Sequence, residues 1–218
     1  MIDLFYSGPL NIGNPDLKPE ESISIEGGMK FQKSFMRAHI LVFNRYGKNI
    51  IDWVKESEED VWQSNNLTSL NASGFELNAV FYPSELIQRT FPLNYFSISY
   101  SFTNITKSSQ LMISKYVLDF MKNKFTITTN LSIFKNTGIN WRISYQNRAG
   151  GYINFDNGIF GKEVPYKPFW ISDIKLFQNY KKHKIYLEIS NLFNVDYQDF
   201  GNLPQAGRWI RLGINLGI

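Results

Sequence analysis

Cysteine is absent from all 218 residues of the chain. Its absence excludes a disulfide scaffold and thiolate metal sites. No stretch approaches the roughly 18 consecutive apolar residues of a transmembrane helix, so that element is excluded on length. The N-terminal stretch MIDLFYSGPLNIGN has no basic region, apolar core or small-residue cleavage site, and it does not have the pattern of a signal peptide.

Strong charge is lacking as well. Lys and Arg number 23 against 19 Asp and Glu, and the net charge of +4 is too small and too scattered to indicate a nucleic-acid partner. The two histidines, His39 and His183, have no histidine or carboxylate at ligand spacing, so they predict no metal or other cofactor. No set of nucleophile, base and oxyanion donors is visible either, and the sequence does not predict an enzyme.

Aromatic residues are abundant, at 16% of the chain with 18 Phe, 12 Tyr and 5 Trp. They fall in runs with a period of two, which is the period of a β-strand. In the clearest run, residues 93–103 (LNYFSISYSFT), one phase is small and polar, and the other consists of Phe96, Ile98, Tyr100 and Phe102. The same split recurs in residues 125–133, 141–148, 185–190 and 208–218.

This alternation predicts an all-β fold, an antiparallel meander of about nine strands. We expect the strands near residues 22–31, 35–54, 61–82, 93–103, 114–134, 139–155, 169–180, 184–197 and 207–218. The links between them alternate between two lengths. The short links lie at residues 32–34, 135–138 and 181–183, and the long polar links lie at residues 55–60, 104–113, 156–168 and 198–206.

Alternating short turns and long loops are typical of a transmembrane β-barrel. Several runs also extend to about ten residues, the length needed to cross a bilayer at a tilt, whereas strands of soluble sheets average about five or six. The pattern therefore favours part of a transmembrane β-barrel with its apolar face toward lipid and its polar face toward the lumen. A soluble β-sandwich with one wet face is the alternative that the pattern leaves open.

The stretch GNPDLKPE, residues 13–20, fixes the backbone just before the first long strand. Pro15 and Pro19 lock φ and push the residues before them toward extended geometry. By itself the stretch is a turn that leads into a strand. Four further motifs follow it in order, IDWV (51–54), NASGFELNAVFYP (71–83), YQNRAGGY (145–152) and NLFNVDYQDFGNLPQAGR (191–208).

In this order, the five motifs resemble the C-terminal part of the barrel of TonB-dependent outer-membrane receptors of the cobalamin and siderophore types, with Asn147 where an Asp is usual. The resemblance implies a 22-stranded barrel filled by a plug domain. It identifies residues 22–218 as the C-terminal portion of the barrel and residues 1–21 as an extracellular segment before it, without the plug. The residues that carry the match are Asn14, Pro15, Leu17, Lys18, Pro19, Glu20, Glu26, Gly74, Glu76, Asn191, Leu192, Phe193, Asn194, Tyr197, Gly207 and Arg208.

The resemblance also implies a location and a function. It implies the outer membrane of a Gram-negative bacterium and TonB-dependent uptake of an iron-siderophore or a cobalamin, by binding and gating without bond chemistry. The expected partners are membrane lipid, the barrel-assembly machinery, the bulky ligand, and TonB through a plug domain only. Two alternatives stay open: a small porin or adhesin barrel, which would pair the strand at Ser22 with that at Arg208, and a soluble sugar-binding β-domain.

Two groups of residues are candidate sites outside those motifs. The run ESEED supplies oxygen ligands suited to Ca²⁺, from Glu56, Glu58, Glu59 and Asp60, although a solvated hairpin tip explains it more simply. Arg142 and Arg148 share the polar phase of one strand and are possible lumenal contacts for an anionic ligand. Lumenal arginines also pair with protein carboxylates, which is the structural explanation for this pair.

Overall fold

The computed structural model describes residues 2–57, 59–87, 91–107, 113–114, 119–156, 158–201 and 203–217. Its helical elements are α1 (Ile2–Phe5) and the 3₁₀ helix η1 (Pro83–Glu85). In the described ranges no helix has the length and apolar character needed to span a membrane. The strands are β1 (Asn11–Ile12), β2 (Glu21–Gln32), β3 (Met36–Lys55), β4 (Trp62–Phe81), β5 (Leu93–Lys107), β6 (Ile113–Ser114), β7 (Met121–Phe134), β8 (Thr137–Arg148), β9 (Gly151–Asp156), β10 (Ile159–Pro165), β11 (Phe169–Tyr180), β12 (His183–Ser190) and β13 (Trp209–Asn215).

Two compact units make up the chain. Unit 1 comprises Met1–Gly27, Val42–Phe75 and Thr103–Phe120. Unit 2 comprises Gly28–Leu41, Glu76–Phe102 and Met121–Ile218, and it contains β7 to β13.

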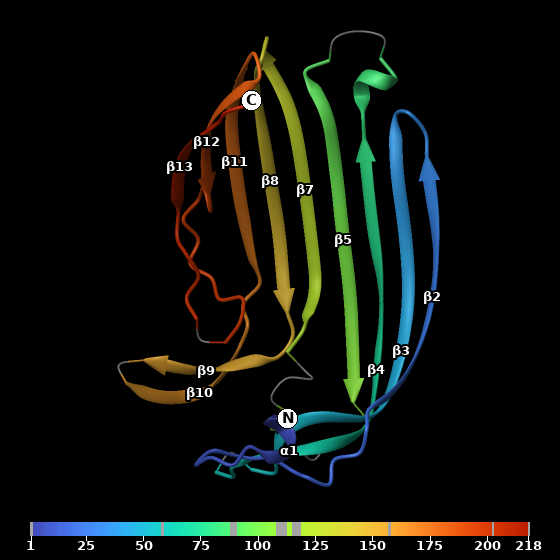
Figure 1. Ribbon diagram of the computed structural model, residues 1–218, viewed down its shortest axis with the longest axis vertical. Helices are drawn as coiled ribbons and strands as arrows, with labels where there is room; N and C mark the ends of the chain where they lie inside the picture. The colour runs from blue at the N-terminus through green and yellow to red at the C-terminus, as the bar shows by residue number, and fades with distance from the viewer. Residues whose placement is uncertain are drawn as a thin grey trace. The chain divides into compact units, whose positions relative to one another are not determined.

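The main sheet follows the order β13-β12-β11-β8-β7-β5-β4-β3-β2, and β1 and β6 pair with β4 and β3 beside this path. The pairings from β5 to β13 are antiparallel, and Figure 1 shows β7, β8, β11, β12 and β13 side by side. The predicted all-β meander of about nine strands is confirmed. β2 and β13 are the ends of the path. A pairing between them, which a small self-contained barrel requires, is not among the strand pairs of the described residues.

One predicted strand and one predicted link differ from the structure because of a glycine. The strand expected at residues 139–155 ends at Arg148, and Gly150 follows with a φ of 85°, in the left-handed region that glycine adopts without strain. The chain then forms the separate hairpin β9–β10, seen in Figure 1, which occupies most of the link expected at residues 156–168.

Two other strands are shorter than predicted. The strand expected at residues 184–197 ends at Ser190, because the next residue, Asn191, has a φ of 49° and turns the chain out of the sheet. In the strand expected at residues 114–134, Ser114 belongs to β6 and β7 begins at Met121, while residues 115–118 lie outside the described residues. The remaining predicted strands agree with the observed ones to within a few residues.

The strand registers place the two phases of the sequence on opposite faces of the sheet. Ile98 of β5, Ile127 of β7 and Ile143 of β8 pair directly in one row. A second apolar row crosses five strands and consists of Leu131, Ile139, Leu176, Leu187 and Leu212. Because side chains alternate between faces along each strand, the residues of the other phase, such as Thr128 and Arg142, form a separate polar face. The predicted division into two faces is confirmed for β5 to β13.

Little of the apolar surface is buried. The buried apolar side chains of the described residues are Trp53, Val54, Pro83, Tyr166 and Ile171. On the apolar face of β13, by contrast, Leu212 is 78% exposed and Ile214 is 61% exposed. A continuous apolar face of this kind is a surface for contact with lipid or another protein, because water solvates it poorly.

Candidate functional site

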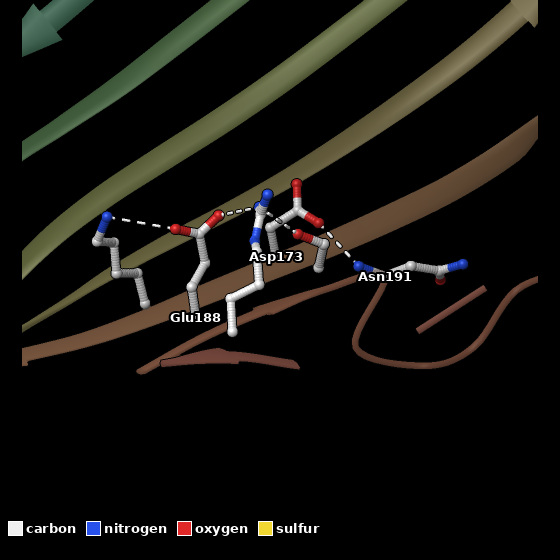
Figure 2. Close-up of polar contacts among 6 residues, drawn as sticks. Asp173, Glu188 and Asn191 are labelled. Atoms are coloured by element: carbon white, nitrogen blue, oxygen red, sulfur yellow. Dashed lines mark hydrogen bonds and ion pairs between the residues drawn. The ribbon is translucent and has the colours of Figure 1, made fainter. Parts of the chain in front are cut away.

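The polar face of β11, β12 and β13 carries a row of three charged residues. The registers place Lys175, Glu188 and Arg211 directly beside one another on consecutive strands. Figure 2 shows the Glu188 carboxylate with a contact on each side, 3.3 Å to Lys175 Nζ and 2.5 Å to Arg211 Nη2. Lys175 Nζ also lies 3.8 Å from the centroid of the Tyr186 ring. One carboxylate is therefore shared by two cations, and this charged row joins three strands.

Asp173 lies on the same face of β11, directly opposite Arg142 of β8. Its carboxylate accepts the backbone N–H of Asn191 at 2.9 Å, as Figure 2 shows. This hydrogen bond satisfies the first backbone donor after β12. Asp173 therefore anchors the start of the connection between β12 and β13.

Two asparagines then shape that connection. Asn191 is buried; its side-chain amide donates to the carbonyls of Val195 at 2.8 Å and Ala206 at 3.4 Å, and its Oδ1 accepts the Val195 N–H at 2.9 Å. Asn194 accepts the Arg208 N–H through Oδ1 at 2.8 Å. The two residues have φ values of 49° and 53°, in the region that asparagine tolerates better than most residues. The asparagines of the NLFN motif therefore have a structural role, closing the loop on itself.

The other matched residues near this loop support its packing. A Cβ at Gly207 would lie 2.8 Å from Asn194 Oδ1, so a side chain there would displace the oxygen that accepts the Arg208 N–H. The Leu192 N–H donates to a backbone carbonyl of β11 at 2.7 Å, and the Tyr197 ring packs against the first residue of β11 with centroids 4.4 Å apart. Phe193 is 69% exposed.

The GNPDLKPE stretch has a structural role in unit 1, alongside the short parallel pairing of β1 with β4. Asn14 Oδ1 accepts the backbone N–H two residues on, at 2.9 Å. The Lys18 backbone both donates to and accepts from the Asn66 side chain, at 2.8 and 3.0 Å, and Glu20 Oε1 accepts the Ile51 N–H at 2.7 Å. The stretch is therefore held against β3 and β4 by its own backbone and side chains. Between these contacts lie Pro15, Leu17 and Pro19.

The remaining matched residues lie within strands, Glu26 in β2 and Gly74 and Glu76 in β4. Of the calcium candidates, Glu58 lies outside the described residues. The Asp60 carboxylate accepts both the backbone N–H and the hydroxyl of Ser57 at 2.8 Å, which is a turn within the hairpin tip. Glu56 and Glu59 belong to the same tip. Within the described part of the chain, no three or more His, Asp or Glu residues form a group that could hold a metal.

A cleft of about 380 Å³ opens on the polar face beside the charged row. Residues of β8, β11, β12 and β13 and of the β12–β13 connection line it. They are Arg142, Ser144, Gln146, Ile171, Asp173, Ser190, Asn191, Tyr197, Ala206, Gly207, Trp209 and Arg211. This cleft is the candidate functional site, because it joins two guanidinium groups, several neutral hydrogen-bonding groups and two aromatic rings.

The structure separates the two arginines that the sequence singled out. Arg148 lies 3.5 Å from Asp199, and its guanidinium lies over the rings of Tyr166 and Phe200, at 5.7 and 6.0 Å from their centroids. Arg142 is exposed and lines the cleft. The structural explanation, pairing with a protein carboxylate, therefore applies to Arg148.

Tyr197 contributes a neutral phenol to the cleft. Burial, followed by the nearby carboxylates of Asp199 and Asp173, raises the pKa of Tyr197 above its ordinary value. A Tyr side chain already titrates near pH 10 when unperturbed. The Tyr197 hydroxyl is therefore protonated at neutral pH and available as a donor.

Sequence reasoning did not single out Lys175, Glu188, Asp173 or Trp209 as site residues. The polar phase of their strands is visible in the sequence, and it is the signal that assigns them to the same face. Which strand residues stand opposite each other depends on register across the links, and the alternating pattern of one strand does not contain that information.

Replacing Glu188 with Gln is expected to lower the free energy of unfolding by about 1 kcal/mol at low ionic strength, because two cations lose the charge that they share. Urea titration in detergent micelles measures this loss, with Glu26→Gln in β2 as the control. The difference between the two variants should shrink in about 1 M salt, where the screening length is about 3 Å. Equal losses in the two variants, or a loss that salt leaves unchanged, would show that the charged row does not stabilise the sheet.

Comparison with known proteins places this sheet among receptors of one kind. The family described as "TonB dependent receptor-like, beta-barrel" matches residues 1–192. The Vitamin B12 transporter BtuB of Vibrio vulnificus is 32% identical over 69 residues, which cover 32% of this chain and 11% of the transporter.

Solved structures give the same fold. The FrpB iron transporter from Neisseria meningitidis (F3-3 variant) superposes with a TM-score of 0.66 at 20% identity, over 91% of this chain and 31% of that one. The ferric-catecholate import receptor Fiu from E. coli K12 superposes with a TM-score of 0.67 at 18% identity, over 97% of this chain and 30% of that one. The chain thus spans less than a third of the length of these structures. Because the family match covers most of its residues, the chain belongs to the TonB-dependent receptor family and corresponds to part of its β-barrel.

Proposed function

We propose that this chain forms part of the wall of an outer-membrane receptor for TonB-dependent uptake of a bulky, scarce nutrient, either an iron-siderophore or a cobalamin. These strands contribute by enclosing a lumen and by helping to bind the nutrient and gate its passage. No covalent bond is made or broken. TonB would act through a plug domain and not through these strands. Outer-membrane lipid and the barrel-assembly machinery are its other proposed partners.

The observation that carries this proposal is the division of the sheet into two faces. The apolar rows that cross β5 to β13 suit contact with lipid, and the charged row of Lys175, Glu188 and Arg211 suits a water-filled lumen. BtuB is a vitamin B12 transporter and FrpB an iron transporter by name, which supports this range of nutrients. In the proposal, residues 22–218 form the wall and residues 1–21 lie at its outer end.

The proposal gives the links a definite orientation, with the long ones outside the cell and the tight turns in the periplasm. We expect a membrane-impermeant maleimide, added to intact cells that carry the full-length protein, to label Lys162→Cys in β10. Lys135→Cys, in the tight turn between β7 and β8, should stay unlabelled until the cells are broken. Because this sequence contains no native cysteine, it adds no background labelling by the maleimide. Labelling of Lys135→Cys alone would reverse the orientation, and equal labelling at both positions would contradict the proposal.

A further inference from the structure

The two guanidinium groups that line the cleft differ in their surroundings. Arg211 is paired with Glu188 at 2.5 Å and also donates to the Ser190 hydroxyl at 3.2 Å. Arg142 is exposed and forms no side-chain hydrogen bond or ion pair with any residue in the described ranges. Of the two arginines that line the cleft, Arg142 is therefore the one without a direct ion pair.

The carboxylate that stands opposite Arg142 forms a hydrogen bond elsewhere, through one of its two oxygens. Arg142 stands opposite Asp173 of β11 on one side and Thr128 of β7 on the other. The Asp173 carboxylate accepts the Asn191 N–H at 2.9 Å, and this hydrogen bond holds the start of the β12–β13 connection. Thr128 carries no charge. The exposed Arg142 side chain therefore lines the cleft without a hydrogen bond or ion pair to either cross-strand neighbour.

The other lining groups suit an anion that carries a ring. Gln146 and the neutral Tyr197 phenol line the same cleft and supply uncharged donors. Trp209 of β13, which is 58% exposed, contributes an indole ring to the lining of the cleft. The guanidinium fork matches a carboxylate with two parallel hydrogen bonds, and an indole stacks on a planar ring.

We propose that this cleft binds the carboxylate of a small, ring-bearing organic acid, with Arg142 as its anchor and Trp209 beside the ring. The inference rests on the proposed function, because the polar face must be open to water for a ligand to arrive. It adds to that function a chemical class of ligand group and a named residue that recognises it. The carboxylate that Arg142 binds in this proposal belongs to a small molecule from solvent and not to a side chain of the protein.

Benzoate is the probe that tests this inference, with benzamide as its uncharged match. The full-length protein is purified in detergent micelles, and binding is measured by saturation-transfer NMR and by calorimetry. We expect saturable benzoate binding in the millimolar range, weaker by about tenfold in Arg142→Gln, the effect of one charge-assisted hydrogen bond. Arg142→Lys should recover part of the binding, since it keeps the charge and loses the fork.

The control variant is Arg45→Gln, which removes an exposed strand arginine that contacts the Ser22 hydroxyl in unit 1. It should bind benzoate as the unmodified protein does, and benzamide should bind weakly to every variant. Equal benzoate affinity in Arg142→Gln and Arg45→Gln, or equal binding of benzoate and benzamide, would overturn the proposal. Failure of the unmodified protein to bind benzoate would overturn the proposal too. Arg142 would then be assigned to pairing with a carboxylate of the protein. The labelling of Lys162→Cys on cells tests the proposed function independently of all these outcomes.

Discussion

Arginine in place of Ile98 is expected to lower the free energy of unfolding in a bilayer by about 2 to 4 kcal/mol. Ile98 lies in the apolar row with Ile127 and Ile143. In the proposed orientation its side chain meets lipid near the bilayer midplane, where a guanidinium carries a cost of this size. Urea titration of the full-length protein, folded in vesicles, measures the change.

The control is arginine at Ser97, one residue away on the polar face and paired with Thr128. Ser97 suits this purpose better than Ser99. The Ser99 hydroxyl donates a hydrogen bond to Asn78 at 2.6 Å, and a substitution there would remove that bond as well as add a charge. Ser97→Arg should change the free energy of unfolding little, because a lumenal arginine keeps its water. Equal losses at the two positions would contradict the assignment of lipid and lumen to these faces.

Aspartate in place of Asn191 is expected to cost about 2 to 4 kcal/mol of stability, independent of any membrane. The amide nitrogen now lies 2.8 Å from the Val195 carbonyl and 3.4 Å from that of Ala206. A carboxylate oxygen there would face two acceptors in a buried position, where an unsatisfied charged group costs several kcal/mol. Urea titration measures the loss, and faster hydrogen exchange at the Val195 amide should show that the loop has opened.

Asn194→Asp provides a matched control for that variant. Asn194 has nearly the same φ, 53° against 49°, but it acts through its oxygen, which accepts the Arg208 N–H. Aspartate keeps this acceptor, and the side chain is exposed, so the free energy of unfolding should change by less than about 1 kcal/mol. A loss at Asn194 as large as that at Asn191 would show that backbone conformation, and not the donated hydrogen bonds, explains the effect.

The fold could be predicted from the sequence where the signal is local. The alternation in residues 93–103 identifies the face on which Ile98 lies, because the side chains of a strand alternate with a period of two. The nine-strand meander followed from the number of such runs and the short links between them. Where a single backbone angle decides, the prediction was wrong: Gly150 and Asn191 end their strands through positive φ values that an alternating pattern does not reveal.

The candidate site could be predicted only in part. Arg142 and Arg148 are equivalent in the sequence, since both belong to the polar phase of one strand. They differ in the structure because Asp199 and two aromatic rings surround Arg148, whereas the Asp173 carboxylate opposite Arg142 is held by a backbone N–H. These partners come from distant parts of the chain, and only the register of β8 with β11 and the course of the β12–β13 connection bring them together.

The two-faced membrane wall is tested most directly by spin labels along β7. Single cysteines at consecutive positions from Thr126 to Leu131 are labelled with a nitroxide in the full-length protein, reconstituted in vesicles. Oxygen, which partitions into lipid, should relax the labels at Ile127, Thr129 and Leu131 most strongly, and a water-soluble nickel chelate those at Thr126, Thr128 and Asn130. The two profiles should thus alternate with a period of two and in opposite phase. Strong relaxation by the nickel chelate at every position would contradict the account and favour a soluble sheet.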